Sequence, residues 1–154
     1  MKKIALFPGS FDPFTVGHES IVKRAIPLFD RIIIGIGVND AKQAFFPDNI
    51  RIDLVKEVFA DYNSVEVITY KGLTIDFCKS VGAQYIIRGL RTSADFEFER
   101  VIGQVNKVLD EGIETIFMLT APEHSFISSS IVRDVYKNGG DITYFIPEKM
   151  HGKL

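Results

Sequence analysis

The sequence predicts an α/β fold in which five parallel strands form a doubly wound sheet. Five short β-branched apolar runs alternate with five stretches whose apolar residues recur at helical spacing. Several of these runs are apolar at consecutive positions, as expected of parallel strands that helices cover on both faces. The chain has 154 residues, of which 46% are hydrophobic and 25% charged, as is typical of one globular domain. We therefore expect one domain over residues 1–154.

Each strand is expected at a β-branched run, and each helix in the amphipathic stretch that follows it. The predicted strands cover residues 4–7, 32–38, 65–70, 85–87 and 115–119. The apolar stripes of the predicted helices begin at Ile21, Ile52, Leu73, Phe98 and Ile131. Pro27 should kink or end the first helix near Ile26, because proline has no amide hydrogen for the helix. Gly139 and Gly140 follow the last helix, and we expect the tail beyond them to be poorly ordered.

Charge and cysteine content exclude several classes of protein. The chain carries 18 Lys and Arg against 20 Asp and Glu, a net charge of −2, whereas a nucleic-acid coat protein needs a basic excess. Its one cysteine, Cys78, cannot form an intramolecular disulfide or a cysteine metal cluster, and it suits a reducing cytosol. No apolar run approaches the ~18 residues of a membrane span, and the apolar segment before Pro8 is too short for a signal peptide. We expect a cytoplasmic protein that binds neither nucleic acid nor membrane.

Two polar loops follow the first and fourth predicted strands. Residues 8–18 are rich in turn formers and hydroxyls, and residues 88–93 carry two arginines. In an open parallel sheet, ligands bind beyond the carboxyl ends of the strands, where the winding direction reverses. If the first and fourth strands are neighbours, the two loops face each other across a crevice. The sequence therefore predicts a ligand site between them.

Two short segments at helix starts suit an anion. Thr15, Gly17 and His18 precede the first apolar stripe, and a helix N-terminus offers free N–H groups and the positive end of its dipole. His18 would point at the same anion, or else Thr15 merely caps the helix and His18 is solvated. A run of serines stands before the fifth helix and has the same two interpretations, a helix cap or a phosphate cradle: Ser128, Ser129 and Ser130.

Arg88 and Arg91 flank a glycine directly after the fourth predicted strand. An arginine pair at this edge of a sheet is well placed to bind phosphate in a bidentate manner. Lys42 follows the second strand and could reach the same crevice, although a lone lysine is usually solvated. Phosphate-loop, dinucleotide and nucleophile-elbow motifs are absent from the sequence. The acidic residues downstream, together with Arg100, are interpreted as a charged helix face: Asp95, Glu97 and Glu99.

Together these residues closely resemble the phosphopantetheine adenylyltransferase family over essentially the whole chain. The T-x-G-H element at residues 15–18 alone would mark only the wider nucleotidyltransferase superfamily. The run Arg-Gly-Leu-Arg at residues 88–91, together with Ile-Ser-Ser-Ser at residues 127–130, is much more specific. The resemblance implies a Rossmann-like nucleotidyltransferase fold and a homohexamer. It also implies Mg²⁺ held mainly by ATP oxygens, with no metal site built from protein residues.

The reaction that the resemblance implies is transfer of the adenylyl group of ATP to 4′-phosphopantetheine, which gives dephospho-coenzyme A and pyrophosphate. By resemblance His18 stabilises the transition state, and Arg91 contacts the triphosphate. Ser10 and Lys42 hold the acceptor phosphate, and all four residues are expected to be catalytic. The acceptor side further includes Thr74 and Arg88. The residues that match ATP-binding positions are Ser10, Phe11, His18, Gly89, Leu90, Arg91, Glu99, His124, Ser125, Phe126, Ile127, Ser128, Ser129 and Ser130.

Two other functions compete with this one. The first is adenylyl or cytidylyl transfer to another phosphate-bearing acceptor, which the Arg-Gly-Leu-Arg run disfavours only through the resemblance. The second is a non-catalytic nucleotide-binding module that uses the same crevice for sensing. A sensor needs affinity but no stabilisation of transition-state charge. The joint presence of His18, Lys42 and Arg91 therefore favours an enzyme.

Overall fold

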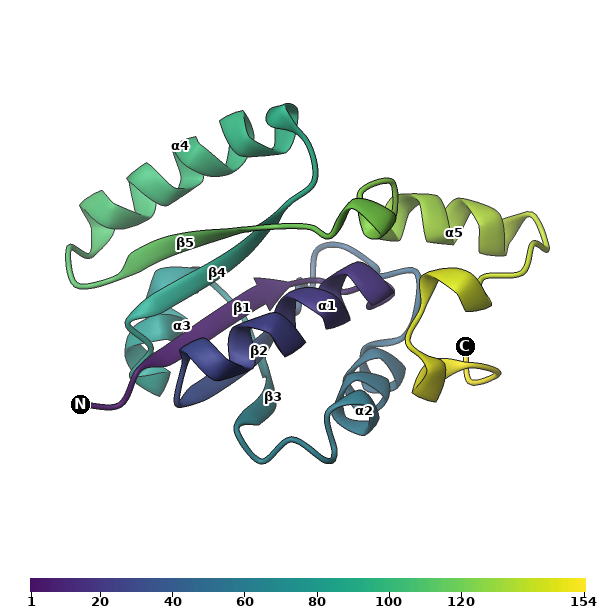
Figure 1. Cartoon of the computed structure of the whole chain (residues 1–154), viewed down its shortest axis with the longest axis horizontal. Helices are drawn as coiled ribbons and strands as arrows, with labels where there is room; N and C mark the ends of the chain where they lie inside the picture. The colour runs from purple at the N-terminus through teal and green to yellow at the C-terminus, as the bar shows by residue number, and fades with distance from the viewer.

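The computed structural model describes residues 1–154 and contains one five-stranded sheet with helices on both faces (Figure 1). The strands run in the order β3-β2-β1-β4-β5, and every neighbouring pair is parallel. The chain therefore winds outward from β1 to β3 and returns to place β4 beside β1, which confirms the predicted doubly wound sheet. The strands are β1 (Ile4–Gly9), β2 (Arg31–Gly37), β3 (Val65–Tyr70), β4 (Tyr85–Leu90) and β5 (Glu114–Leu119).

Helices cover both faces because consecutive apolar residues of a strand point to opposite sides. Ile32 and Ile34 belong to the larger core, which packs against α1, α2 and α5. Ile33 lies between them in the sequence but packs in the smaller core with Cys78 of α3. No helix combines the length and the apolar character that a membrane crossing requires. The helices are α1 (Val16–Ala25), α2 (Asp48–Val58), α3 (Thr74–Val81), α4 (Ser93–Leu109) and α5 (Ser129–Lys137).

The expectation of a poorly ordered C-terminal tail is wrong. After α5 the chain forms two short 3-10 turns, Thr143–Phe145 and Glu148–Met150. The three apolar residues Ile142, Ile146 and Met150 are buried in the larger core. These three residues stand four positions apart, but Pro147 lies among them and glycines lie on either side, so the sequence did not indicate a continuous helix there and their burial was not recognised.

The first helix ends as Pro27 predicts, since α1 stops at Ala25 and a 3-10 turn follows. Two strands, however, are longer than expected. β1 continues to Gly9 in register with β2, and β4 continues to Leu90 in register with β5. Arg88 therefore lies inside β4, opposite Phe117, rather than in the loop after it. Pairing of β1 with β2 and of β4 with β5 sustains the extended backbone, although Pro8, Gly9 and Gly89 are turn formers.

Candidate active site

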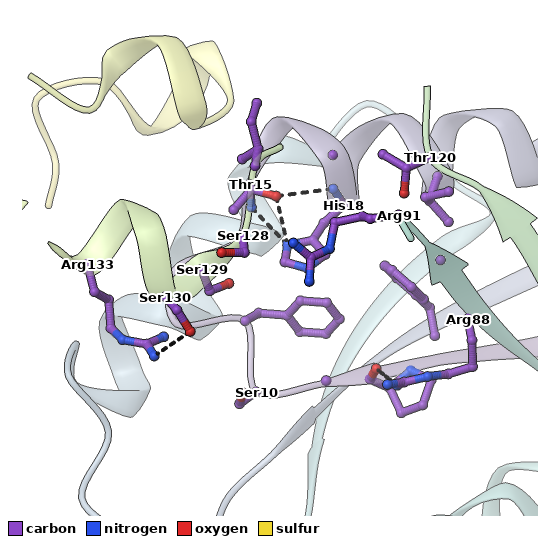
Figure 2. A pocket seen from close by; sticks show the side chains of 18 residues that line it. Ser10, Thr15, His18, Arg88, Arg91, Thr120, Ser128, Ser129, Ser130 and Arg133 are labelled. Atoms are coloured by element: carbon purple, nitrogen blue, oxygen red, sulfur yellow. Dashed lines mark hydrogen bonds between the residues drawn. The ribbon is translucent and has the colours of Figure 1, made fainter. Parts of the chain in front are cut away.

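A crevice opens between β1 and β4 at their carboxyl ends. The two strands pair only at Ala5–Tyr85 and Leu6–Ile86, and beyond these positions they separate. Pro8 has no amide hydrogen to donate to a neighbouring strand, and its carbonyl instead accepts a hydrogen bond from Arg88 Nη1 at 2.8 Å. A cavity of about 400 Å³ lies here, bounded by both predicted loops and by the start of α5 (Figure 2). The expectation that the two loops face each other is confirmed.

The loop after β1 is fixed by hydrogen bonds from two other parts of the chain. The Ser10 carbonyl accepts a hydrogen bond from the buried guanidinium of Arg51 in α2. The Asp12 carboxylate is also buried and accepts the amides of Phe45 and Phe46 at 2.7 and 2.9 Å. These contacts fix the backbone of the loop, including that of Ser10, before any ligand binds.

Phe11 folds its ring beneath Gly9, which explains why a glycine is needed there. A Cβ atom on Gly9 would lie 2.9 Å from Phe11 Cζ, closer than such contacts allow. Phe11 itself has a φ of 48°, which is uncommon for a bulky residue and is held by the surrounding packing. Its ring meets the His18 ring edge-on, with 5.0 Å between centroids. Phe11 thus forms a rigid apolar wall behind His18.

His18 has a single tautomer set by its hydrogen bonds with Thr15. The Thr15 amide donates to His18 Nδ1 at 3.0 Å, while the His18 amide donates to Thr15 Oγ1 at 3.3 Å, a reciprocal capping box. Because Nδ1 is an acceptor, the proton of the neutral ring lies on Nε2. The predicted cap at Thr15 is confirmed, but the alternative of a solvated His18 is wrong, since the ring packs against Phe7, Phe11 and Phe14.

The surroundings of His18 keep its ring neutral. Loss of solvation on burial, followed by the charges of Arg88 and Arg91, lowers the pKa of His18 from 6.5 to about 3. At neutral pH the residue is therefore an uncharged N–H donor rather than a cation. Its side chain borders the cavity, as does that of Arg91 (Figure 2).

This depressed pKa predicts that the unliganded protein loses stability in mild acid. Below its ordinary pKa of 6.5 the histidine binds a proton in the unfolded state, but in the folded state it does so only near pH 3. The unfolded state binds more protons than the folded state in this window. The free energy of unfolding therefore decreases by up to about 1.4 kcal/mol for each unit by which the pH falls. Urea unfolding at pH 7 and pH 5 measures this contribution against His18→Gln, which lacks the titrating ring. A parent and variant with the same pH dependence would contradict the neutral buried state.

The two arginines of the crevice are each paired with a carboxylate of α4. Arg88 donates from Nε and Nη2 to the two carboxylate oxygens of Glu99, both at 2.8 Å. Arg91 approaches Asp95 with its Nε at 3.4 Å, and its amide donates to the same oxygen at 3.0 Å. Glu99 is therefore not simply part of a charged surface of the helix, because it is only 9% exposed and both of its oxygens accept from Arg88. Its partner lies 11 residues away, outside any local pattern.

Two further cavities adjoin the first. One of about 750 Å³ is bordered by Ser10 and Arg88 and extends to Thr74. The other, of about 460 Å³, is bordered by Ser10, Lys42 and Arg133. Ser10 thus stands where all three cavities meet, and Thr74 shares a cavity with it and with Arg88, as the acceptor-side prediction requires. Lys42 lies in the third cavity and does not line the first.

The positions expected to bind ATP divide into two groups. One group lines the first cavity: Ser10, Phe11, His18, Gly89, Arg91, Ile127, Ser128, Ser129 and Ser130. The other group lies outside its lining: Leu90, Glu99, His124, Ser125 and Phe126. Of these, Leu90 is buried, whereas Phe126 is 55% exposed. The crevice therefore brings together nine of the fourteen positions, including those of the predicted phosphate site. The other five do not line the cavity.

Each of the three serines has a structural partner as well as a place in the cavity. Ser128 caps α5 by accepting the amide of Ile131 at 3.2 Å. Ser129 donates to the Pro13 carbonyl at 2.8 Å and so links α5 to the loop after β1. Ser130 accepts from Arg133 Nη2 at 3.2 Å near the surface. Capping is thus confirmed at Ser128, and the phosphate cradle stays a prediction for the other two.

Single replacement of these serines by alanine should separate the two roles. Ser128→Ala removes the cap, which typically costs about 0.5–2 kcal/mol of stability. Ser129→Ala or Ser130→Ala should instead weaken ATP binding while the melting temperature of the unliganded protein stays near that of the parent. Ser130→Ala separates the two roles best, because the Ser130 hydroxyl has one hydrogen bond, from the Arg133 guanidinium near the surface. Calorimetry with ATP and thermal unfolding give both quantities. Loss of stability in proportion to affinity in all three variants would leave capping as a sufficient explanation.

Sequence reasoning missed two cavity residues, Arg133 and Thr120. Arg133 Nη1 donates to the Asp12 carbonyl at 2.8 Å and joins α5 to the loop after β1. It stands four residues after Ser129, on the same helix face, so the helical period could have revealed it. Thr120 follows β5 directly, at the sheet edge that carries the other site residues.

The chain is similar to known proteins over most of its length. The model of the cytidylyltransferase-like family matches residues 6–135. A phosphopantetheine adenylyltransferase of Flavobacterium psychrophilum is 58% identical over 149 residues, which cover 97% of this chain and 98% of that protein. Another from Cytophaga hutchinsonii is 51% identical over 150 residues, which cover 97% of this chain and all of that protein.

Solved structures share the fold at low sequence identity. A bifunctional NMN adenylyltransferase/ADP ribose pyrophosphatase from Francisella tularensis superimposes with a TM-score of 0.71 and is 16% identical. The match covers 95% of this chain and 45% of that longer one. A second structure, from Vibrio parahaemolyticus, gives a TM-score of 0.71 at 21% identity over 97% of this chain and 96% of that one. At these identities the likeness supports the fold alone.

Proposed function

This chain belongs to the cytidylyltransferase-like family and, within it, to the phosphopantetheine adenylyltransferases, and we propose that the crevice between β1 and β4 is its active site. The enzyme transfers the adenylyl group of ATP to 4′-phosphopantetheine and so forms dephospho-coenzyme A and pyrophosphate, a step of coenzyme A biosynthesis. One observation carries the assignment of the site: a neutral histidine and two arginines line one cavity that opens onto a second, larger one.

The reaction exchanges one phosphoanhydride bond for another. An oxygen of the acceptor phosphate attacks the α-phosphorus of ATP, and a new P–O bond forms as the bond from that phosphorus to the β-bridging oxygen breaks. Pyrophosphate leaves with that bonding electron pair. The attacking oxygen is already ionised, so no general base is required. Catalysis of such a transfer depends on positioning and on stabilising the charge that develops.

His18 is proposed to supply the transition-state stabilisation. The Thr15 amide donates to Nδ1 and so leaves the ring proton on Nε2, where it can be donated to a ligand. As the α-phosphorus becomes five-coordinate, negative charge grows on its non-bridging oxygens, and a fixed N–H donor binds these more strongly than in the ground state. The neutral ring at pH 7 avoids the cost of burying a cation beside Arg88 and Arg91.

The remaining residues are proposed to hold the two substrates on opposite sides of His18. Arg91, Ser129 and Ser130 border the first cavity and would bind the triphosphate. Ser10 and Arg88 stand between the first and second cavities, where the acceptor phosphate must meet the α-phosphate. The second cavity continues past Thr74 and offers space for the pantetheine arm. Lys42 reaches the acceptor phosphate from the third cavity, which shares Ser10.

Mg²⁺ is proposed to accompany ATP, coordinated mainly by its phosphate oxygens. The chain holds no group of three or more histidine, cysteine or acidic residues that could bind a metal, and nucleotide-bound Mg²⁺ commonly takes its ligands from phosphates and water. When bound, the ion would neutralise triphosphate charge.

A cytoplasmic homohexamer is the proposed working form. The helix α4 carries an apolar face that no other part of the chain covers: Phe98, Val101, Val105 and Val108 are 68%, 50%, 52% and 85% exposed. Exposed apolar patches of this kind mark contacts between proteins. We propose that a second copy of the chain covers this face of α4. Sedimentation of the purified protein measures the assembly.

A coupled assay of pyrophosphate release tests the proposed substrate. The enzyme is given ATP with 4′-phosphopantetheine, nicotinate mononucleotide, glycerol phosphate or a sugar phosphate in turn, and each reaction is run with and without the acceptor. We expect release only with phosphopantetheine. Release with another acceptor alone would assign the chain a different substrate, and binding of ATP without release on any acceptor would favour a non-catalytic module.

A further inference from the structure

One face of α4 holds both arginines of the crevice. Asp95 and Glu99 are four residues apart and therefore lie one above the other on the helix. Asp95 pairs with Arg91, and Glu99 pairs with Arg88. The two pairs differ in geometry, because the first has one side-chain contact at 3.4 Å whereas the second has two hydrogen bonds at 2.8 Å.

The contacts of Arg88 fix its guanidinium completely. Nε and Nη2 donate to Glu99, and Nη1 donates to the Pro8 carbonyl, each at 2.8 Å. An arginine has five N–H groups in one plane, so one N–H on each Nη remains for a ligand. Paired on one edge by a carboxylate and on another by a strand carbonyl, the plane cannot rotate without breaking a hydrogen bond.

Glu99 has no access of its own to either substrate cavity. Arg88 borders both the 400 and the 750 Å³ cavities, whereas Glu99 borders neither. The Glu99 side chain is only 11% exposed, and both of its oxygens are occupied by Arg88. Glu99 borders a smaller space of about 200 Å³, which is also lined by Pro8, Thr74 and Arg88.

From this geometry we infer that Glu99 is a positioning residue that acts on the reaction through Arg88 and does not itself bind ATP. The inference rests on the proposed function, in which Arg88 orients the acceptor phosphate. It also replaces the expectation, drawn from resemblance alone, that Glu99 contacts the nucleotide. The carboxylate holds the two free N–H groups of Arg88 at the junction of the cavities, so that the acceptor meets the α-phosphorus in line.

Loss of Glu99 should therefore impair use of the acceptor and spare ATP. A glutamine at position 99 keeps one acceptor oxygen for Arg88 but places an NH2 group against its other donor and removes the negative charge. The Arg88 side chain, already 31% exposed, can then turn towards solvent. A displacement of about 1 Å at a reacting group can lower a rate by about 10²-fold. We expect Glu99→Gln to lower kcat/KM for phosphopantetheine by about 10–100-fold, with the dissociation constant of ATP within about twofold of the parent.

A double-mutant cycle on kcat/KM for phosphopantetheine tests this dependence on Arg88. Glu99→Gln is measured in the parent and in an Arg88→Ala background, and ATP binding is measured separately by calorimetry. Glu97→Gln is the matched control, since this neighbouring carboxylate is 67% exposed and pairs only with Arg100. Glutamine keeps the shape of glutamate. Melting temperatures identify any variant that is unfolded, and Glu99→Asp, which keeps the charge, then takes its place in the cycle.

We expect the Glu99 substitution to change kcat/KM less than about twofold once Arg88 is absent, because its route to the reaction has been removed. Equal losses in both backgrounds, or a weakened affinity for ATP in Glu99→Gln, would show an independent role and overturn the inference. An active parent with unaffected Glu99 variants would overturn the inference alone. A parent inactive on phosphopantetheine would instead overturn the proposed function, and the role of Glu99 with it.

Discussion

His18→Ala is expected to lower kcat by about 10²–10³-fold, the usual loss when one donor to a developing oxyanion is removed. ATP affinity should fall much less, because the Nε2–H bond strengthens only as charge develops on the α-phosphate. Single-turnover kinetics with saturating substrates measure the chemical step, and calorimetry measures ATP binding. Collapse of ATP affinity with turnover of bound substrate preserved would contradict the role of His18.

The alanine variant also breaks the capping box, so a matched variant is needed. His18 Nδ1 accepts the Thr15 amide, and a glutamine at this third helical position can do the same through its side-chain oxygen. His18→Gln should therefore keep more of the stability than His18→Ala and yet lose turnover to a similar extent. If His18→Gln were fully active, the capping contact rather than the aimed N–H would be the contribution of His18 to catalysis.

Arg91→Ala and Lys42→Ala are expected to have opposite effects on the two substrates. Arg91 borders the first cavity and Lys42 the third, on either side of Ser10. A hydrogen bond to a charged group contributes about 1.5–3 kcal/mol, so each loss should weaken its own ligand by about 10–100-fold. Arg91→Ala should weaken ATP binding more than phosphopantetheine binding, and Lys42→Ala the reverse.

Calorimetry with each ligand alone provides the comparison. Lys137→Ala serves as a control for loss of a positive charge, because this lysine lies at the far end of α5 and borders none of the three cavities. It should bind both ligands as the parent does. Identical profiles for Arg91→Ala and Lys42→Ala would remove the distinction between an ATP side and an acceptor side.

The sheet and the location of the crevice could be predicted because they depend on short-range patterns. Consecutive apolar residues such as Ile32, Ile33 and Ile34 indicate a strand that is covered on both faces, and five such runs separated by helices leave few topologies. The position of His18 at a helix start follows from the sequence in the same way. Its tautomer and its neutral charge do not, because they depend on contacts with Thr15 and on the arginines of β4 and the loop after it.

The features that sequence reasoning missed depend on contacts between distant segments. Glu99 has the spacing of a solvated helix residue, and only the fold brings it to Arg88. The helical spacing from Ser129 could have pointed to Arg133, but not to its hydrogen bond with the Asp12 carbonyl, 121 residues earlier in the chain. The tail residues Ile146 and Met150 are buried by packing on the core, although Pro147 between them argues against a continuous helix. The sequence thus predicts which residues lie near the site, whereas the residues that they pair with are seen only in the structure.

The most direct test of the mechanism follows the oxygens of the acceptor phosphate. Phosphopantetheine with ¹⁸O in its three non-bridging phosphate oxygens is incubated with ATP and the enzyme, and both products are analysed by mass spectrometry. Direct attack on the α-phosphorus in the crevice predicts dephospho-coenzyme A that retains all the label, with unlabelled pyrophosphate that forms only when the acceptor is present. Label in the pyrophosphate, its loss from the nucleotide product, or pyrophosphate formed without acceptor would contradict direct transfer.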